Sequence, residues 1–253
     1  MEGAVNEVTE VALSTVFLSE AFGTAILMLL GCGVVANVVL PRTKGNGADW
    51  LLISFGWGLA VFSGVYVAHA SGAHLNPAVT IGMLARHNAE YAPGVTITPA
   101  STVVYLVAQF LGGFVGALVC WLAYKKHFDA AGEEGVATIG VFSTGPEIRS
   151  YGWNFVTEVI ATFVLVYVIL VFGETPSELG PLAVAMLVVA IGACLGGPTG
   201  YAINPARDLS PRLVHTLLPI PNKVSSDWSY SWVPVLGPLV GGALAGVAAM
   251  VIG

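Results

Sequence analysis

The stretch GAHLNPAVTIGMLAR occupies residues 72–86, and a second stretch, GYAINPARDLSPRLV, occupies residues 200–214. Each contains the triplet Asn-Pro-Ala. Asparagine is a favoured N-cap residue, because its side-chain oxygen accepts hydrogen bonds from the first free amides of a helix. Proline suits the next position, where its fixed φ matches the first turn and its missing N–H is not needed. Two abrupt helix starts are therefore predicted, at Asn76, Pro77, Ala78 and at Asn204, Pro205, Ala206.

The composition places these helix starts in a membrane protein. Of the 253 residues, 56% are hydrophobic and 9% are charged, and the mean hydropathy is +0.82. A soluble domain is about 25% charged. The net charge of −6 indicates little, and the lack of a basic patch argues against a nucleic-acid partner. The three cysteines have no metal-ligand spacing and no nucleophile–base pair is apparent, so we expect no metal, no cofactor and no enzyme activity.

Apolar runs indicate how often the chain crosses the bilayer. About 20 helical residues are needed to span about 30 Å of hydrocarbon. Two runs, 76–86 and 204–216, have only about half that length and begin at the Asn-Pro-Ala triplets. The runs that we predict as spanning helices are residues 15–40, 51–70, 101–124, 153–172, 179–195 and 232–252.

The two halves of the chain repeat each other. EAFGT at residues 20–24 matches EVIAT at residues 158–162, and Asn76 matches Asn204. Each half has three spanning helices, so the second half enters the membrane from the opposite side, which makes an inverted repeat typical of transport proteins. The predicted fold is one all-α membrane domain over residues 1–253, with six transmembrane helices and two re-entrant half-helices. The repeats cover residues 14–124 and 150–252, and a polar loop, 125–149, joins them.

Two helix N-termini that meet at the centre of a membrane favour the passage of neutral molecules. The positive ends of both helix dipoles would repel a cation, and the amides of Asn76 and Asn204 would remain as donors to a water or hydroxyl oxygen. Irregular backbone at this depth is tolerated where it lines a cavity, so the segments before each asparagine are expected to supply carbonyl acceptors. The expected pore-lining backbone is that of Gly72, Ala73, His74, Thr199, Gly200 and Ala202.

The segments SGAHLNPAVTIG and GYAINPARD, with two membrane glutamates, resemble the aquaporin family, and most closely its glycerol-conducting branch, the aquaglyceroporins. The resemblance implies a tetramer with one pore in each subunit, narrowest at a constriction of aromatic and arginine side chains. On this resemblance Arg207 is the filter arginine, and Trp57 and Tyr201 are its aromatic walls. Gly192 would leave the room that a three-carbon polyol needs. Tyr201 replaces the phenylalanine of the bacterial pattern, which leaves the ratio of water to glycerol open.

Three acidic residues fall in apolar or re-entrant segments. We interpret Glu20 and Glu158 as acceptors for the amides of the two re-entrant loops; proton relay in a coupled carrier is the alternative. By resemblance, Asp208 braces the loop that carries the filter arginine. A gating role for the ring of His74 is an alternative to a role of its backbone alone.

The leading hypothesis is a passive channel for glycerol and other small uncharged solutes, with water, that excludes protons and ions. The alternatives are a mainly water-selective aquaporin and, from another class, an ion-coupled secondary transporter. The resemblance implies a homotetramer in the plasma membrane, with both termini in the cytoplasm. On that topology only Arg86 lies on the inner connectors, which opposes the positive-inside rule. The basic residues on the outer side would be Arg42, Lys44, Lys125, Lys126, Arg149 and Lys223.

Overall fold

The computed structural model describes residues 10–172, 175 and 178–251. The predicted end of the sixth span at Ile252 and most of the connector 173–178 lie outside these residues. The elements, in chain order, are α1 (Leu13–Val39), α2 (Trp50–Val67), η1 (His69–Ser71), α3 (Pro77–Ala85), β1 (Glu90–Ala92), β2 (Val95–Thr96), α4 (Pro99–Ala123), α5 (Lys125–Glu134), α6 (Ile139–Phe142), α7 (Tyr151–Phe172), α8 (Pro181–Leu195), α9 (Pro205–Leu217) and α10 (Val233–Ala249).

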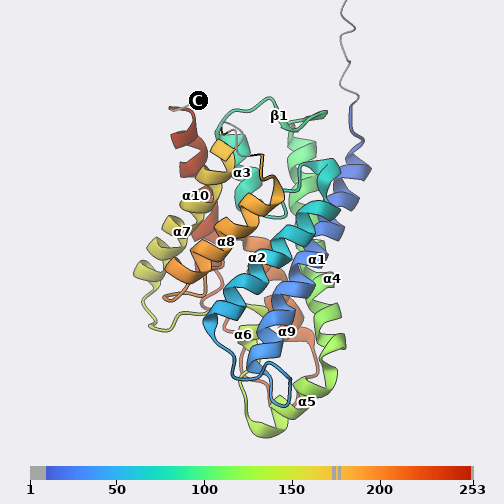
Figure 1. The fold of residues 1–253 in the computed structure, drawn as a ribbon, viewed down its shortest axis with the longest axis vertical. Coiled ribbons are helices and arrows are strands. Elements are labelled where there is room, and N and C mark those ends of the chain that lie inside the picture. Colours follow the sequence, from blue (N-terminus) through green and yellow to red (C-terminus); the bar gives the residue numbers. More distant parts are fainter. Residues whose placement is uncertain (1–9, 173–174, 176–177, 252–253) are drawn as a thin grey trace, which may run out of the picture.

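The two short helices predicted from the Asn-Pro-Ala triplets are present as α3 and α9. They lie in opposite halves of the molecule: α3 is in the upper half, towards the hairpin β1–β2, and α9 is in the lower half, near α6 (Figure 1). Each half-helix packs against the third long helix of the other repeat, α3 on α10 and α9 on α4. The predicted fold of six spanning helices and two half-helices in an inverted repeat is therefore confirmed.

The spanning helices differ in length. Among the described helices, α1, α2, α4 and α7 are long and apolar enough to cross a membrane. α8 and α10 are also apolar but have 15 and 17 residues, which is about 22 and 26 Å of helix. α8 starts at Pro181, after the N-cap Gly180, and the fixed φ of this proline suits its first turn. Large apolar side chains such as Phe22 (62% exposed) and Leu59 (58% exposed) cover the outer surface, as expected where helices face lipid.

Glycines bring the helices of the bundle into close contact. A Cβ on Gly242 or on Gly246 would lie 2.3 Å from a backbone oxygen of α3. A Cβ on Gly112 or on Gly116 would lie 2.3 or 2.2 Å from a backbone oxygen of α1. Real Cβ atoms do not approach oxygen so closely, so any larger residue would push these helix pairs apart.

The segment 125–149 is not the polar loop that we predicted. It contains α5 and the four-residue helix α6. On α5 the side chains of Lys125 and Asp129 form an ion pair one helical turn apart, and Gly135, with a φ of 73°, ends the helix. The hairpin β1–β2 between α3 and α4 was not predicted either. In Figure 1, α5 lies at the end of the molecule opposite to the hairpin, and α1 begins and α10 ends on the side of the hairpin.

Candidate pore

Asn76 and Asn204 cap the two half-helices. The Oδ1 atom of Asn76 accepts a hydrogen bond from the amide of Ala78 at 2.8 Å, and Oδ1 of Asn204 accepts one from the amide of Ala206 at 3.0 Å. A proline occupies the first position of each helix. Both helix starts predicted from the triplets are therefore present, with the capping that the residue types favour.

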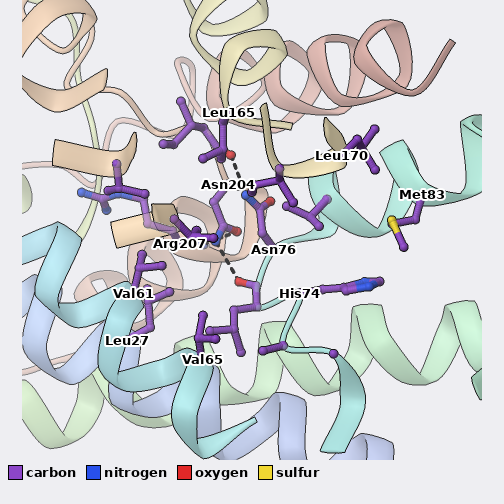
Figure 2. Close-up of a pocket in the computed structure, with 18 of the residues that line it drawn as sticks. Leu27, Val61, Val65, His74, Asn76, Met83, Leu165, Leu170, Asn204 and Arg207 are labelled. Atoms are coloured by element: carbon purple, nitrogen blue, oxygen red, sulfur yellow. Dashed lines mark hydrogen bonds between the residues drawn. The ribbon is translucent and has the colours of Figure 1, made fainter. Parts of the chain in front are cut away.

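The amide groups of the same asparagines connect the two loops. Nδ2 of Asn76 donates to the carbonyl of Ile203 at 2.8 Å, and Nδ2 of Asn204 donates to the carbonyl of Leu75 at 2.8 Å; Figure 2 marks these bonds with dashed lines. We expected both amides to remain as donors to a molecule in the passage, and the structure shows in addition that one hydrogen of each binds the opposite loop. Because an amide has two hydrogens, one donor on each asparagine is left for a molecule in the passage.

The backbone before each asparagine adopts the left-handed conformation at equivalent positions of the two loops. In a non-glycine residue this conformation costs about 1–3 kcal/mol and persists only where the surroundings enforce it. The φ angles are 78° at Gly72, 54° at Ala73 and 55° at Leu75 in the first loop, and 81° at Gly200, 39° at Tyr201 and 45° at Ile203 in the second.

Glu20 holds the first loop. This fully buried carboxylate accepts hydrogen bonds from the amides of His74 (2.9 Å) and Leu75 (2.8 Å). It also accepts from the hydroxyl of Ser71 (2.6 Å) and from Nε2 of Gln109 (2.8 Å). Four donors point at two oxygens, so the ionised form satisfies all of them and a proton on the carboxyl would face another donor. These bonds supply the enforcement that the left-handed backbone requires.

Glu158 holds the second loop in the same manner. It is fully buried and accepts from the amides of Ala202 (3.0 Å) and Ile203 (2.9 Å). The hydroxyl of Thr199 donates to it at 2.6 Å. Thr199 is fully buried and does not line either cavity described below, so the expectation that it lines the pore was wrong: it supports the loop from behind.

Two cavities meet at three side chains. The larger has a volume of about 450 Å³ and runs from Arg207 past both capping asparagines to Met83. The smaller, of about 220 Å³, lies on the other side, towards the loop after α6. Trp57, Tyr201 and Arg207 line both cavities, which makes them the boundary between the two. Figure 2 shows the larger cavity with apolar side chains on either side of the asparagines; they include Leu27, Val61, Val65, Leu165 and Leu170.

Arg207 lies directly over an aromatic face at this boundary. Its Cζ atom is 4.0 Å from the centroid of the Trp57 ring, which is a close cation–π contact. Its Nη1 atom donates to the carbonyl of Phe142, the last residue of α6, at 3.2 Å. The side chain is 6% exposed. An arginine at this depth is expensive, and its fixed N–H fork offers donors to a passing hydroxyl.

Gly192 has a different role from the one that we predicted. It does not line either cavity, and a Cβ on it would lie 2.9 Å from both Cζ and Oη of Tyr201. The space beside this glycine therefore holds the end of the tyrosine ring and is not free for a solute. We expected this space to be free for the solute because no sequence pattern indicates where the tyrosine ring lies.

Asp208 connects α9 to the loop that forms one wall of the smaller cavity. Its Oδ2 atom accepts from the amide and the hydroxyl of Thr144, at 2.7 and 2.8 Å. Arg212, one turn further along α9, donates to Asp208 through Nε at 2.9 Å, and both side chains are fully buried. Arg212 also donates to the carbonyls of Thr144 and Ser226, at 2.9 and 2.8 Å. The pair thus ties two loops to the half-helix that carries Arg207.

The ring of His74 is held on three sides. Nε2 lies 3.2 Å from the carbonyl of Tyr91, which can only accept, so Nε2 carries the hydrogen and Nδ1 accepts from the hydroxyl of Thr80 at 3.0 Å. The ring stacks on Tyr105, with centroids 4.5 Å apart. His74 therefore joins the hairpin and α4 to the first loop.

Sequence reasoning missed two contributors to the site. Gln109 was detectable, because a polar side chain in an apolar span needs a buried partner, and here that partner is Glu20. The carbonyl of Phe142 left no signal, because any residue type offers a backbone oxygen to Arg207.

Two half-helices that meet inside a bundle of spanning helices, with cavities on both sides of a buried arginine, define a membrane channel for small molecules. The chain belongs to the Major intrinsic protein family, which it matches over residues 7–249.

Individual relatives agree with this assignment. The chain is 52% identical over 235 residues to "Glycerol uptake facilitator protein 3" of Lactiplantibacillus plantarum, which covers 92% of this chain and 94% of that protein. It is 49% identical over 235 residues to the "Probable glycerol uptake facilitator protein" of Thermotoga maritima, covering 91% and 96%. The fold is similar to the X-ray structure of the aquaglyceroporin from Plasmodium falciparum, with a TM-score of 0.78, 32% identity, and 93% and 94% of the two chains covered.

Proposed function

We propose that the protein is a passive channel that conducts glycerol and other small uncharged solutes, together with water. The observation that carries this proposal is the boundary between the two cavities, where the Arg207 guanidinium lies over the Trp57 ring and Tyr201 lines the same point. A polyol has a hydroxyl edge and a C–H edge. The guanidinium offers donors to the first and the rings offer an apolar face to the second. The names of the relatives, which are glycerol uptake facilitators, support the same solute.

The exclusion of ions follows from the same geometry. The N-termini of α3 and α9 both point at the centre, where their dipoles favour negative charge and disfavour cations. Arg207 adds a full positive charge, and the mostly apolar walls give an anion few compensating donors. Neutral molecules avoid both penalties, so the channel is passive and does not catalyse a reaction.

An ion-coupled carrier requires one repeat to move against the other. Here the bonds from Asn76 to Ile203 and from Asn204 to Leu75 join the repeats at the centre. The two membrane glutamates are occupied by loop amides, which leaves them no role as coupling sites. These contacts favour a channel over a carrier. A mainly water-selective pore is the alternative that the experiment below addresses.

We place the protein in the plasma membrane as a homotetramer, with residues 14–124 and 150–252 as two repeats of one channel domain. Support for the assembly comes from the family resemblance and from the apolar outer surface, where side chains such as Phe22 are exposed. The start of α1 and the end of α10 lie at one end of the molecule (Figure 1), which supports our proposal that both termini are cytoplasmic. Labelling of single cysteines introduced into the hairpin and into α5 would test this orientation.

The function is tested by light scattering of proteoliposomes shocked with glycerol, beside runs with an impermeant sugar. We expect fast shrinkage in both solutes and reswelling in glycerol faster than in empty liposomes. Arg207→Ala should change the ratio of glycerol to water permeability and admit small cations, whereas Arg42→Ala, on an exposed loop, should leave both unchanged. Fast shrinkage without faster reswelling in glycerol would mean a water pore and would overturn the proposal.

A further inference from the structure

The indole of Trp50 connects the start of α2 to the end of α8. Its Nε1 atom donates to the carbonyl of Gly192 at 2.8 Å. That carbonyl belongs to the last turn of α8, so the bond ties the beginning of α2 to the end of α8. Trp50 is 41% exposed and lines the smaller cavity.

The same indole packs against the aromatic wall of the constriction. The rings of Trp50 and Tyr201 meet edge to face, with centroids 5.8 Å apart and an interplanar angle of 77°. Two glycines at the end of α8 form a further wall. A Cβ on Gly196 would lie 2.5 Å from the carbonyl oxygen of Gly192, 2.6 Å from Cδ1 of Tyr201 and 2.8 Å from Cζ2 of Trp50. A Cβ on Gly192 would lie 2.9 Å from Cζ and Oη, at the other end of the tyrosine ring.

The Tyr201 ring thus occupies a slot whose sides are Trp50, Gly192 and Gly196. The backbone of Tyr201 is fixed by the second loop, with a φ of 39°, and the direction of its ring depends in addition on the groups that surround it. The bond from Trp50 to α8 holds two sides of the slot together.

We propose that Trp50 is a positioning residue that fixes the Tyr201 ring and thereby sets the largest solute that passes the constriction. This proposal rests on the proposed function, since it concerns the selectivity of the same channel. Trp50 acts through Tyr201 and not by holding the solute itself. Two variants that disturb the slot in opposite senses should shift the size selectivity in opposite directions.

Trp50→Phe keeps an aromatic ring and removes the N–H that bonds to Gly192. The Tyr201 ring then gains room to turn away from the pore. We expect the permeability ratio of erythritol to glycerol to rise by up to about ten-fold. A protein pocket discriminates between two ligands that differ by one carbon group by about ten-fold or more, so a partial loss of the fit stays within that range. Trp153→Phe is the matched control, because Trp153 is 75% exposed and lines neither cavity. An unchanged ratio in Trp50→Phe would overturn the proposal.

Gly196→Ala places a methyl group against Tyr201 and should push the ring towards the pore. We expect glycerol permeability to fall more than water permeability. Gly152→Ala is the control, since a Cβ there meets nothing within 4 Å. An equal fall for both solutes would contradict the proposal, because a merely weakened fold lowers the amount of active channel without changing its selectivity.

The two proposals fail in distinguishable ways. If the wild-type protein conducts no glycerol, the proposed function is wrong, and the water permeability of folded Trp50→Phe then decides whether the indole positions the ring. If the wild type conducts glycerol and both variants keep its selectivity, only the positioning role is wrong. If Trp50→Phe does not assemble, as judged by size-exclusion chromatography, the selectivity of Gly196→Ala decides.

Discussion

Replacing Glu20 by glutamine keeps the size of the side chain and turns one acceptor oxygen into an NH₂ group. In the wild-type protein, Oε1 of Glu20 accepts from Ser71 and His74, and Oε2 accepts from Leu75 and Gln109. If the new NH₂ group takes the place of Oε1, the Ser71 hydroxyl can donate to the carbonyl of Ala68, 2.9 Å away, and accept from the NH₂ group, so only the His74 amide loses its acceptor. The opposite orientation leaves both Leu75 and Gln109 without the oxygen that accepts from them. Each buried donor left unpaired costs about 1–3 kcal/mol, so the variant should lose at least about 1–3 kcal/mol of stability.

The loss is measured as the unfolding temperature of the purified protein in detergent. For a chain of this size, 1 kcal/mol corresponds to about 2–4 °C, so Glu20→Gln should lower the midpoint by at least about 2 °C. Glu134→Gln is the matched control, because Glu134 forms an exposed ion pair with Arg42 that is worth about 1 kcal/mol at most.

Glycerol flux through Glu20→Gln should fall as well, since the first loop loses the bond from the amide of His74 or of Leu75, which helps to enforce its left-handed backbone. An unfolding midpoint and a flux both equal to those of the wild type would refute the reasoning. In that case the buried carboxylate would not be what holds the loop.

Three further predictions concern the half-helix α9 and its surroundings. Arg212→Met should lower the free energy of unfolding by about 3–5 kcal/mol, because it leaves Asp208 as a buried unpaired charge. The double variant with Asp208→Asn should recover part of the thermal stability. No recovery would contradict the pairing. Lys223→Met should cost about 0.5–1.5 kcal/mol of stability per lost bond, because Nζ donates to three carbonyls at the end of α9. The unfolding temperature should therefore fall modestly, and an unchanged midpoint would show that the cap is dispensable. Burial raises the pKa of Asp227, but hydrogen bonds from Arg149 outweigh this and hold the pKa below its ordinary value. The resulting stabilisation is present above the ordinary pKa of about 3.9 and is lost as pH falls through the lower folded value, so thermal scans in acid should show a loss that Asp227→Asn does not share.

Much of the fold could be predicted because the decisive signals are local. The capping chemistry of Asn76 and Asn204 needs only the next few residues, and the apolar runs record the lipid environment directly. The membrane glutamates were interpretable as well, since a buried carboxylate requires donors and the adjacent irregular loops have free amides to give.

What could not be predicted depends on distant partners. Gly192 is adjacent to the ring of Tyr201 only because α8 and the second loop come together, and no pattern within either segment records that contact. α6 is too short to leave a periodic pattern, yet its last carbonyl holds Arg207. α5 did leave signals, in the Lys125–Asp129 pair and the terminal Gly135, but its polar composition favoured a loop.

The crossed bonds between the asparagines and the opposite loops also constrain how such a chain can change over generations. Each repeat supplies the acceptor that the other repeat needs, so a substitution at Asn76 leaves the carbonyl of Ile203 without its donor, and one at Asn204 does the same to Leu75. Neither repeat can therefore lose its asparagine without damage to the loop of the other repeat.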